Sequence, residues 1–175
     1  SLIFSILFSI GADISYGYGQ IYLNQLALPV VLFGIVYTFK SLLVTISANF
    51  TSKLRKRVSY RNIFALQMVI ITVLLYIMAF TESYVIGAVS FILLAFPFGM
   101  FIISRSSYVH QRTRSSHRAT VDSMFSFLIA VVFLFLEPAV GYLADLYTIK
   151  IPFLLIEILL SAYCIYYLAI ERNKI

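Results

Sequence analysis

Charged residues are scarce in this chain, and their scarcity argues against most classes of protein. Of its 175 residues, 11% are charged and 62% are apolar, and the mean hydropathy is +0.98. Soluble domains carry roughly a quarter charged residues, and a globule of this size needs more charge to cover its surface. The composition therefore disfavours a soluble enzyme, a disordered tail and a disulfide scaffold, and it predicts a membrane protein.

Cysteine and catalytic motifs are also nearly absent. The single cysteine, Cys164, lies inside an apolar run, so the sequence contains neither a disulfide framework nor metal-ligand spacing. No Ser-His-Asp arrangement and no glycine-rich phosphate loop is recognisable. His110 and His117 fall in a basic segment, where we expect them to be solvated. The sequence thus predicts no enzyme activity, no cofactor and no metal.

Six segments are long and apolar enough to cross a bilayer as helices, which requires about 20 residues each. They are residues 2–23, 29–50, 62–81, 84–104, 121–143 and 151–170. The predicted fold class is all-α, a polytopic membrane protein whose six transmembrane helices form one bundle. Tryptophan is absent, so tyrosines near the predicted span ends are expected to serve as the interfacial aromatic residues.

The basic residues predict the orientation of these spans. Most of the 13 lie in the loops 53–61 and 105–118, with Arg172 and Lys174 in the tail. Six alternating spans place all of these on one side, which the positive-inside rule assigns to the cytoplasm together with the C-terminus. A nucleic-acid-binding patch would not alternate with the spans. We therefore expect a multi-pass protein of the cell membrane whose partner is the lipid bilayer and not nucleic acid.

Two charges fall near the middle of the first two predicted spans, Asp13 in the first and Lys40 in the second. A charge at that depth costs about 2.5–3.5 kcal/mol on insertion scales. If the two helices form a hairpin, the side chains lie at similar depth and can meet. Two interpretations stay open, a buried structural ion pair and a role in handling substrate or protons.

Polar residues recur around both charges at helical spacing. The stripe in the first span is Ser5, Ser9, Asp13, Tyr16, Gln20 and Asn24. The second span repeats the pattern with Tyr37, Ser41, Thr45 and Ala48. Lipid does not tolerate the polar face of the first span, so that stripe is predicted to line a cavity or a protein interface. Gly17 and Gly19 bracket Tyr18, which predicts a loosened helix or close packing.

Prolines predict two bends. Glu137 precedes Pro138 in the fifth span, and Pro97 to Gly99 interrupt the fourth. A proline frees a backbone carbonyl four residues earlier and kinks the helix. A carboxylate at such a kink suits proton uptake, although a helix shifted by one turn would bring Glu137 to the outer interface. For Glu157, in the sixth span, we expect a structural role or a side chain that snorkels to the interface.

Two passages resemble a known family. Residues 117–123 read H-R-A-T-V-D-S, and residues 138–145 read P-A-V-G-Y-L-A-D. Together they resemble the eleventh helix of bacterial major facilitator superfamily transporters, where an R-A-T-V/I-x-S entry precedes a P-x-x-G-x-L-x-D exit. The first span is similar to the seventh helix of that family, which precedes a glycine-containing eighth helix, as Tyr22 precedes Gly34 here.

The resemblance implies that this chain is the C-terminal six-helix bundle of a twelve-helix carrier, whose N-terminal half is missing from the sequence. It also implies that Arg118 belongs to a cytoplasmic loop motif, and that the first, second, fourth and fifth spans face a central cavity. The family often carries G-x-L-x-D-R-x-G-R-R/K after its eighth helix. Residues 48–57 contain the basic residues of this motif but lack its glycine and aspartate. The resemblance therefore does not extend to a cytoplasmic gate that closes through that aspartate.

The leading hypothesis is a secondary transporter that works by alternating access, with a small molecule and protons as partners. Protons would be coupled through Asp13 or Glu137, and Lys40 would be a charge partner or substrate contact. Drug or small-metabolite efflux is the family's commonest bacterial use, and the Ile/Phe/Lys-rich composition favours a bacterial source. Two alternatives remain, a self-contained six-helix subunit such as the substrate-binding component of a vitamin importer, and a non-transporting membrane protein whose polar stripe packs against a partner helix.

Overall fold

The computed structural model describes residues 2–169, and within them every regular element is a helix. The elements are α1 (Leu2–Gly17), α2 (Gly19–Gln25), α3 (Val31–Leu54), α4 (Tyr60–Phe80), α5 (Tyr84–Leu93), α6 (Ala95–Arg112), the short 3₁₀ helix η1 (Ser115–His117), α7 (Arg118–Leu146) and α8 (Lys150–Ala169). The all-α class predicted from the sequence is confirmed. Arg172 and Lys174 of the predicted cytoplasmic tail lie outside the described residues.

Five helical stretches in the described part of the chain are long and apolar enough to span a membrane. They are Val31–Leu54, Tyr60–Phe80, Tyr84–Gln111, Ser115–Leu146 and Lys150–Ala169. The first predicted span, residues 2–23, is divided at Tyr18, between Gly17 and Gly19, into α1 and the seven-residue α2. The long apolar helices support the membrane class, while the count of six spans stays a prediction.

The fourth predicted span differs from expectation at two points. Its helix is interrupted at Leu94, one turn before the bend expected at Pro97. Proline lacks the N–H that would bond to the carbonyl four residues earlier, and its ring crowds that carbonyl, so the disturbance falls upstream. The helix also continues to Arg112 instead of ending near residue 104. Arg105 and His110, expected in a loop, therefore lie on α6.

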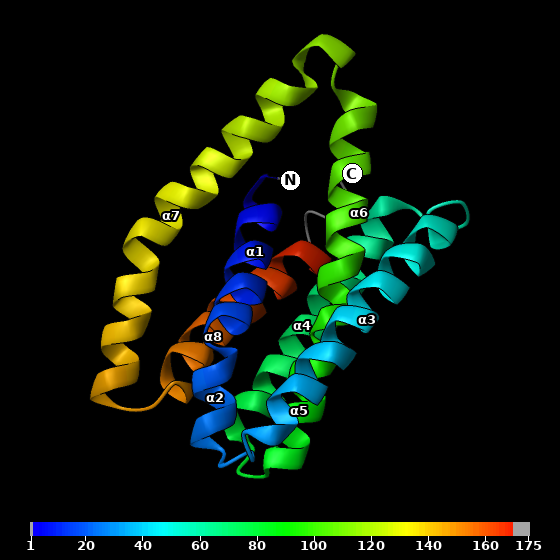
Figure 1. Ribbon diagram of the computed structural model, residues 1–175. Helices are drawn as coiled ribbons and strands as arrows, with labels where there is room; N and C mark the ends of the chain where they lie inside the picture. The colour runs from blue at the N-terminus through cyan, green and yellow to red at the C-terminus, as the bar shows by residue number, and fades with distance from the viewer. Residues whose placement is uncertain (1, 170–175) are drawn as a thin grey trace.

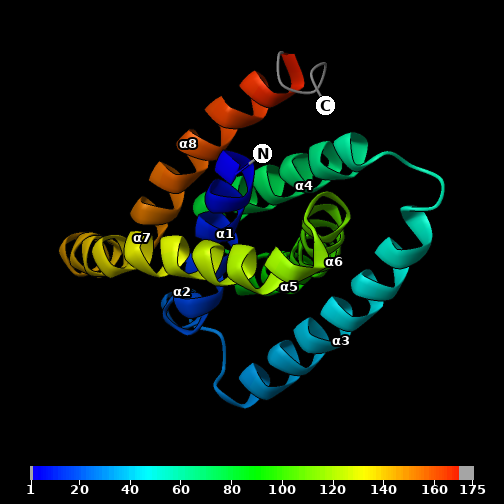
Figure 2. The ribbon, with the colours of Figure 1, turned by 90° about the horizontal axis from the view of Figure 1, so that it is seen from above.

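The fifth predicted span forms the longest helix of the described residues, α7, which passes through Pro138 without interruption. Its axis changes direction partway along (Figure 1). Within residues 5–169, Val140 is the one α7 residue that is buried. In Figure 1 α7 stands at the edge of the bundle, and from above it crosses in front of α1, with α8 on one side and α2 on the other (Figure 2). It packs mainly against α8 and α1.

The helices that follow one another in the sequence are not always the ones that pack together. The predicted hairpin pairs the first two spans, but α3 packs mainly against α6, and α1 packs mainly against α8. Gly99, at the crossing of α3 and α6, explains why these two helices pack together. A Cβ atom on Gly99 would overlap Ser47 Oγ and lie 2.5 Å from the backbone oxygen of Val44. Glycine at this position therefore allows the two backbones to approach closely.

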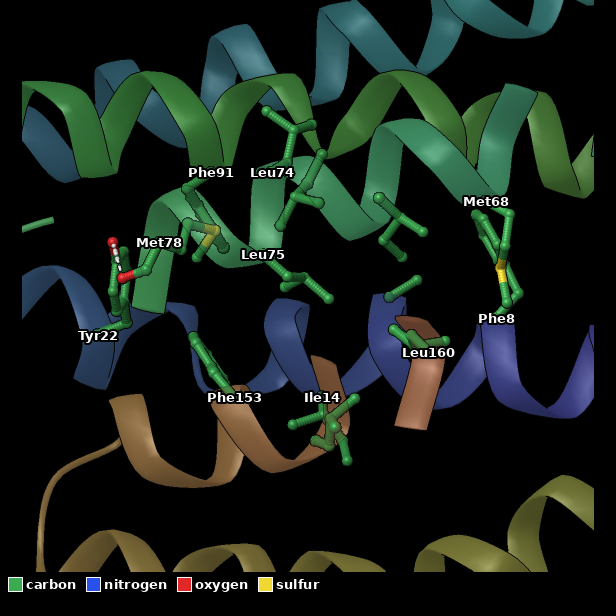
Figure 3. Packing of buried hydrophobic residues seen from close by; sticks show 14 of the residues in the cluster. Phe8, Ile14, Tyr22, Met68, Leu74, Leu75, Met78, Phe91, Phe153 and Leu160 are labelled. Carbon is green, nitrogen blue, oxygen red and sulfur yellow. Dashed lines mark hydrogen bonds between the residues drawn. The ribbon is translucent and has the colours of Figure 1, made fainter. Parts of the chain in front are cut away.

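Apolar side chains from α1, α4, α5 and α8 form the core (Figure 3). Phe8 and Ile14 of α1 are buried against residues such as Met68 of α4 and Leu160 of α8. At one end of this core the Tyr22 hydroxyl donates a hydrogen bond to the backbone oxygen of Met78, at 2.9 Å. This core holds α1, and with it the polar stripe, in a fixed position relative to the rest of the bundle.

Candidate functional site

A cavity of about 400 Å³ lies where α1, α3 and α6 meet, and it contains three of the residues selected from the sequence. Its lining comprises Asp13, Tyr16, Lys40, Ser41, Val44 and Phe98. Asp13 and Tyr16 come from α1, and Lys40 comes from the face of α3 that also buries Val36 and Ser47. The helical period therefore turns the lysine towards the interior, although the surrounding helices are apolar.

Lys40 is held by aromatic rings rather than by a carboxylate. The side chain is 4% exposed, and Nζ lies 3.4 Å from the ring centroid of Phe91, 4.2 Å from that of Tyr16 and 5.9 Å from that of Tyr37. A cation over a ring face is attracted by the negative face of the π system, with a strength of about 2 kcal/mol when the site is desolvated. These rings stabilise the ammonium group at a depth where lipid alone would not.

Asp13 and Lys40 border the same cavity but do not form an ion pair. Among residues 5–111 and 113–169, the ion pairs within 4.0 Å join Arg105 and His110 to Asp122, and Lys150 to Glu82. The structural ion pair considered from the sequence is therefore not formed in this conformation. The cavity presents one carboxylate and one ammonium group that do not neutralise each other directly.

The polar faces of α2 and α3 border two further hollows. One, of about 410 Å³, is lined by Gln20, Ile21, Asn24, Val30 and Phe33. The other, of about 440 Å³, is lined by Tyr37, Thr38, Ser41, Leu42 and Thr45. Ser41 borders both this hollow and the cavity that contains Lys40. The predicted stripes thus border open space over much of their length.

The other end of the first stripe does not belong to this site. Ser9 is buried, and Ser5 lines a separate, mostly apolar cavity of about 310 Å³ beside Arg105 and Asp122. The stripe predicted as one surface therefore divides between two environments.

Glu137 and Pro138 do not line the Lys40 cavity, and both side chains are exposed on α7. A hydrogen bond links α7 to the first helices, since the Tyr18 hydroxyl donates to the backbone oxygen of Glu137 at 2.9 Å.

The two glycines beside Tyr18 differ in their surroundings. A Cβ atom on Gly17 would meet nothing within 4 Å. A Cβ on Gly19 would overlap the ring of Phe91, so Gly19 allows that ring to reach Lys40.

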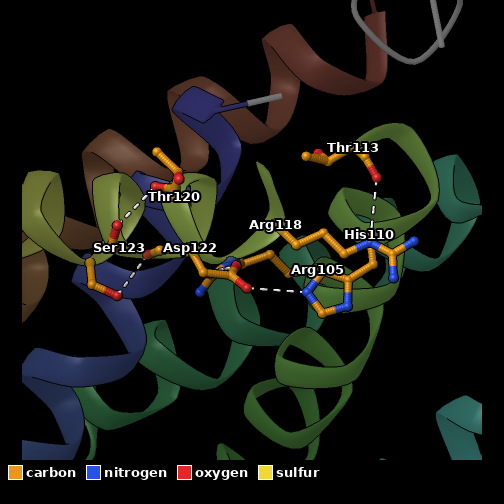
Figure 4. Close-up of polar contacts among 8 residues, drawn as sticks. Arg105, His110, Thr113, Arg118, Thr120, Asp122 and Ser123 are labelled. Carbon is orange, nitrogen blue, oxygen red and sulfur yellow. Dashed lines mark hydrogen bonds and ion pairs between the residues drawn. The ribbon is translucent and has the colours of Figure 1, made fainter. Parts of the chain in front are cut away.

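A polar cluster that the sequence did not reveal joins the ends of α6 and α7 (Figure 4). The Asp122 carboxylate lies 3.6 Å from an Arg105 guanidinium nitrogen and 3.1 Å from His110 Nε2. The Arg105 guanidinium also lies 3.6 Å from the ring centroid of Phe125. Arg118 is not part of this cluster, and its Nε donates to the backbone oxygen of Thr113 at 3.4 Å. The two helices meet beside their short link and then diverge (Figure 1), so the acidic and basic residues on either side of that link are the signal that could have suggested these contacts.

We expect Asp122→Asn to lower the free energy of unfolding by less than about 1 kcal/mol, because partly exposed ion pairs contribute little. The Asp122 side chain is 43% exposed and His110 is 39% exposed. Thermal unfolding of the purified protein in detergent measures the effect, with Asp145→Asn on the same helix as the matched control. A loss of several kcal/mol at Asp122 alone would show that the cluster is a buried anchor for α7.

Glu157, for which the sequence predicted a structural role or snorkelling to the interface, is fully buried at 0% exposure on α8, so its side chain does not snorkel in this conformation. The Ser161 hydroxyl lies 3.0 Å from Glu157 Oε1 and 3.2 Å from the hydroxyl of Tyr76 on α4. Glu157 Oε2 has no hydrogen-bond partner among the described residues. The carboxyl group thus lies within the packing of α4 and α8, away from the cavity that contains Asp13 and Lys40.

No protein-family model and no curated protein sequence matches this chain.

Proposed function

We propose that this chain is the C-terminal six-helix bundle of a secondary transporter of the cell membrane that works by alternating access. The observation that carries the proposal is the cavity of about 400 Å³ bordered by Asp13 and Lys40. Ionisable groups within apolar helices are costly and commonly mark the path of a substrate or ion. Carriers place such groups near the middle of the bilayer, in a cavity between helices.

The exposed surface of α3 supports a carrier that contains a second bundle. One face of α3 carries Thr38, Ser41 and Thr45, and an adjacent face carries Ile35, Phe39, Leu42 and Ile46, all of them exposed. An apolar face suits lipid, whereas a polar face of this length requires water or another protein. A water-filled path between two bundles provides both environments for one helix.

Within this proposal, Lys40 contacts the substrate and Asp13 or Glu137 exchanges protons with the coupling gradient. The basic links between α3 and α4 and between α6 and α7 face the cytoplasm by the positive-inside rule. The substrate is a drug-like molecule or a small metabolite, and the resemblance to bacterial carriers favours export.

Cysteine accessibility tests the proposal. With Cys164 replaced by alanine, Ser41→Cys and Gln20→Cys should react with a membrane-impermeant thiosulfonate at least about ten times faster than Phe39→Cys, which serves as the lipid-facing control, because only ionised thiols in water react readily. A carrier that alternates should expose Ser41→Cys to reagent added on either side of the membrane.

Two results would contradict alternating access. Reaction from one side only would favour a binding subunit with a single opening, such as that of a vitamin importer. Absence of reaction at both Ser41→Cys and Gln20→Cys would favour a stripe that packs against a partner helix.

A further inference from the structure

The charges of the Lys40 cavity specify its occupant more closely than the general function does. Asp13 and Lys40 both line it, and no ion pair within 4.0 Å joins them. We infer that the cavity binds a small zwitterion with an apolar body, whose carboxylate meets Lys40 and whose ammonium group meets Asp13. The inference rests on the proposed function and names its substrate class.

A single charge on the occupant would satisfy only half of this site. In a low-dielectric cavity, a charge without a partner costs far more than it does in water. An anion would neutralise Lys40 and leave Asp13 unpaired, and a cation would do the reverse. A molecule that carries both charges neutralises both side chains, and it loses less than a singly charged molecule when it leaves water.

The contacts of Lys40 leave a place for a carboxylate. The ring faces of Phe91 and Tyr16 attract the ammonium, with Nζ at 3.4 Å and 4.2 Å from their centroids, but rings offer no strong hydrogen-bond acceptor. An ammonium group has three donors, so acceptor oxygens from the cavity complete its coordination. Tyr16 is 49% exposed and lines the cavity together with Lys40, so an occupant of the cavity lies beside this ring.

The rest of the lining suits an apolar or aromatic body. Val44 and Phe98 border the cavity, and the rings of Tyr16 and Phe98 are stacked with centroids 6.4 Å apart. The Ser41 hydroxyl adds one neutral polar group. A volume of about 400 Å³ lies within the usual range for small-molecule sites, about 300–1,000 Å³. An amino acid with an aromatic side chain combines these properties.

The probe for this inference is tritiated L-phenylalanine, and the protein is the full-length chain in lipid nanodiscs. The wild-type protein should bind it saturably. Two competitors carry the same ring with one charge each, 3-phenylpropanoate with the carboxylate and 2-phenylethylamine with the ammonium. Each should compete at least about ten-fold more weakly than unlabelled phenylalanine, because each leaves one buried charge unpaired.

Two variants should each remove the preference for phenylalanine over one of the singly charged competitors. In Asp13→Asn, 3-phenylpropanoate should compete as well as phenylalanine, and in Lys40→Met, 2-phenylethylamine should do so. Asp145→Asn, an exposed acid on α7, is the charge control and should preserve the wild-type order. Because the competitors are compared within each variant, a general loss of affinity would not change their relative order and cannot produce the expected result.

The inference is overturned by an absence of saturable phenylalanine binding, by equal competition from both singly charged analogues in the wild type, or by variants that keep the wild-type order. These outcomes leave the transport proposal intact if Ser41→Cys still reacts from both sides of the membrane. Failure of that reaction would instead contradict the transport proposal itself.

Discussion

Gly99→Val should destabilise the protein by about 3 kcal/mol, at the upper end of the usual cost of overpacking. A Cβ atom at this position overlaps Ser47 Oγ and approaches the backbone of Val44, and backbone atoms of a packed helix cannot rotate away. The side chain therefore has to force α3 and α6 apart. A thiol-reactive fluorophore can follow unfolding through Cys164, the single cysteine, which is 6% exposed in the folded protein.

Gly34→Val is the matched control, because it introduces the same side chain into a helix at a position where a Cβ meets nothing within 4 Å. We expect its unfolding temperature to stay close to that of the wild type. Gly99→Ala supplies a milder version in case the valine variant is not recovered. Equal shifts for the two valine variants would mean that α3 and α6 do not pack as closely as described.

Phe91→Ala should have the second large effect, a loss of about 3–5 kcal/mol, the range for deleting a buried phenylalanine ring. Phe91 is 0% exposed and packs edge-on against Tyr37, with ring centroids 5.6 Å apart. Its removal opens a cavity and also deprives Lys40 of its nearest ring. The same fluorophore assay measures the change, with Phe135→Ala as control because that ring is 73% exposed.

A double-mutant cycle separates the two contributions of Phe91. Combining Phe91→Ala with Lys40→Met should recover about 2 kcal/mol relative to the sum of the single variants, which is the strength of a desolvated cation–π contact. Strict additivity would show that Phe91 acts through packing alone and that the ammonium gains nothing from its ring.

The helical period and the depth of each residue were sufficient to predict part of the site. Asp13, Tyr16 and Lys40 border one cavity because α1 and α3 both turn these residues towards the place where the two helices meet α6. Phe91 could not be predicted, since it is one of 16 phenylalanines and nothing in its spacing distinguishes it. Its place beside Lys40 depends on how α5 packs against α3, which is a property of tertiary structure.

Hydropathy predicted where apolar segments lie better than where helices end. It placed the end of the fourth span near residue 104, but α6 continues to Arg112. Charged residues mark the limit of the apolar region, and arginine is also a good helix former. The contacts of Asp122 with Arg105 and His110 were missed for this reason, because those residues were assigned to a loop.

Which helices pack against each other was harder to predict from the sequence than where the helices lie. Neighbours in the sequence usually pack together, but α1 packs mainly against α8. Small residues decide such contacts, as at Gly11, where a Cβ would lie 2.6 Å from Leu160 Cδ1. Glycines are recognisable in a sequence, whereas the side chain that fills the space beside each of them is not.

The sparse packing of α7 affects how its sequence can change over time. Val140 is its one buried residue within the described part of the chain, so exchanging one large apolar residue for another disturbs little internal packing except at Phe133, Leu136 and Ala144, which pack against the core. Residues such as Met68 and Leu75 of α4, both nearly inaccessible, have no such freedom. Homologous chains should therefore conserve the buried face of α4 for internal packing, whereas conservation along α7, above all in residues 117–123 and 138–145, would indicate a partner outside this bundle.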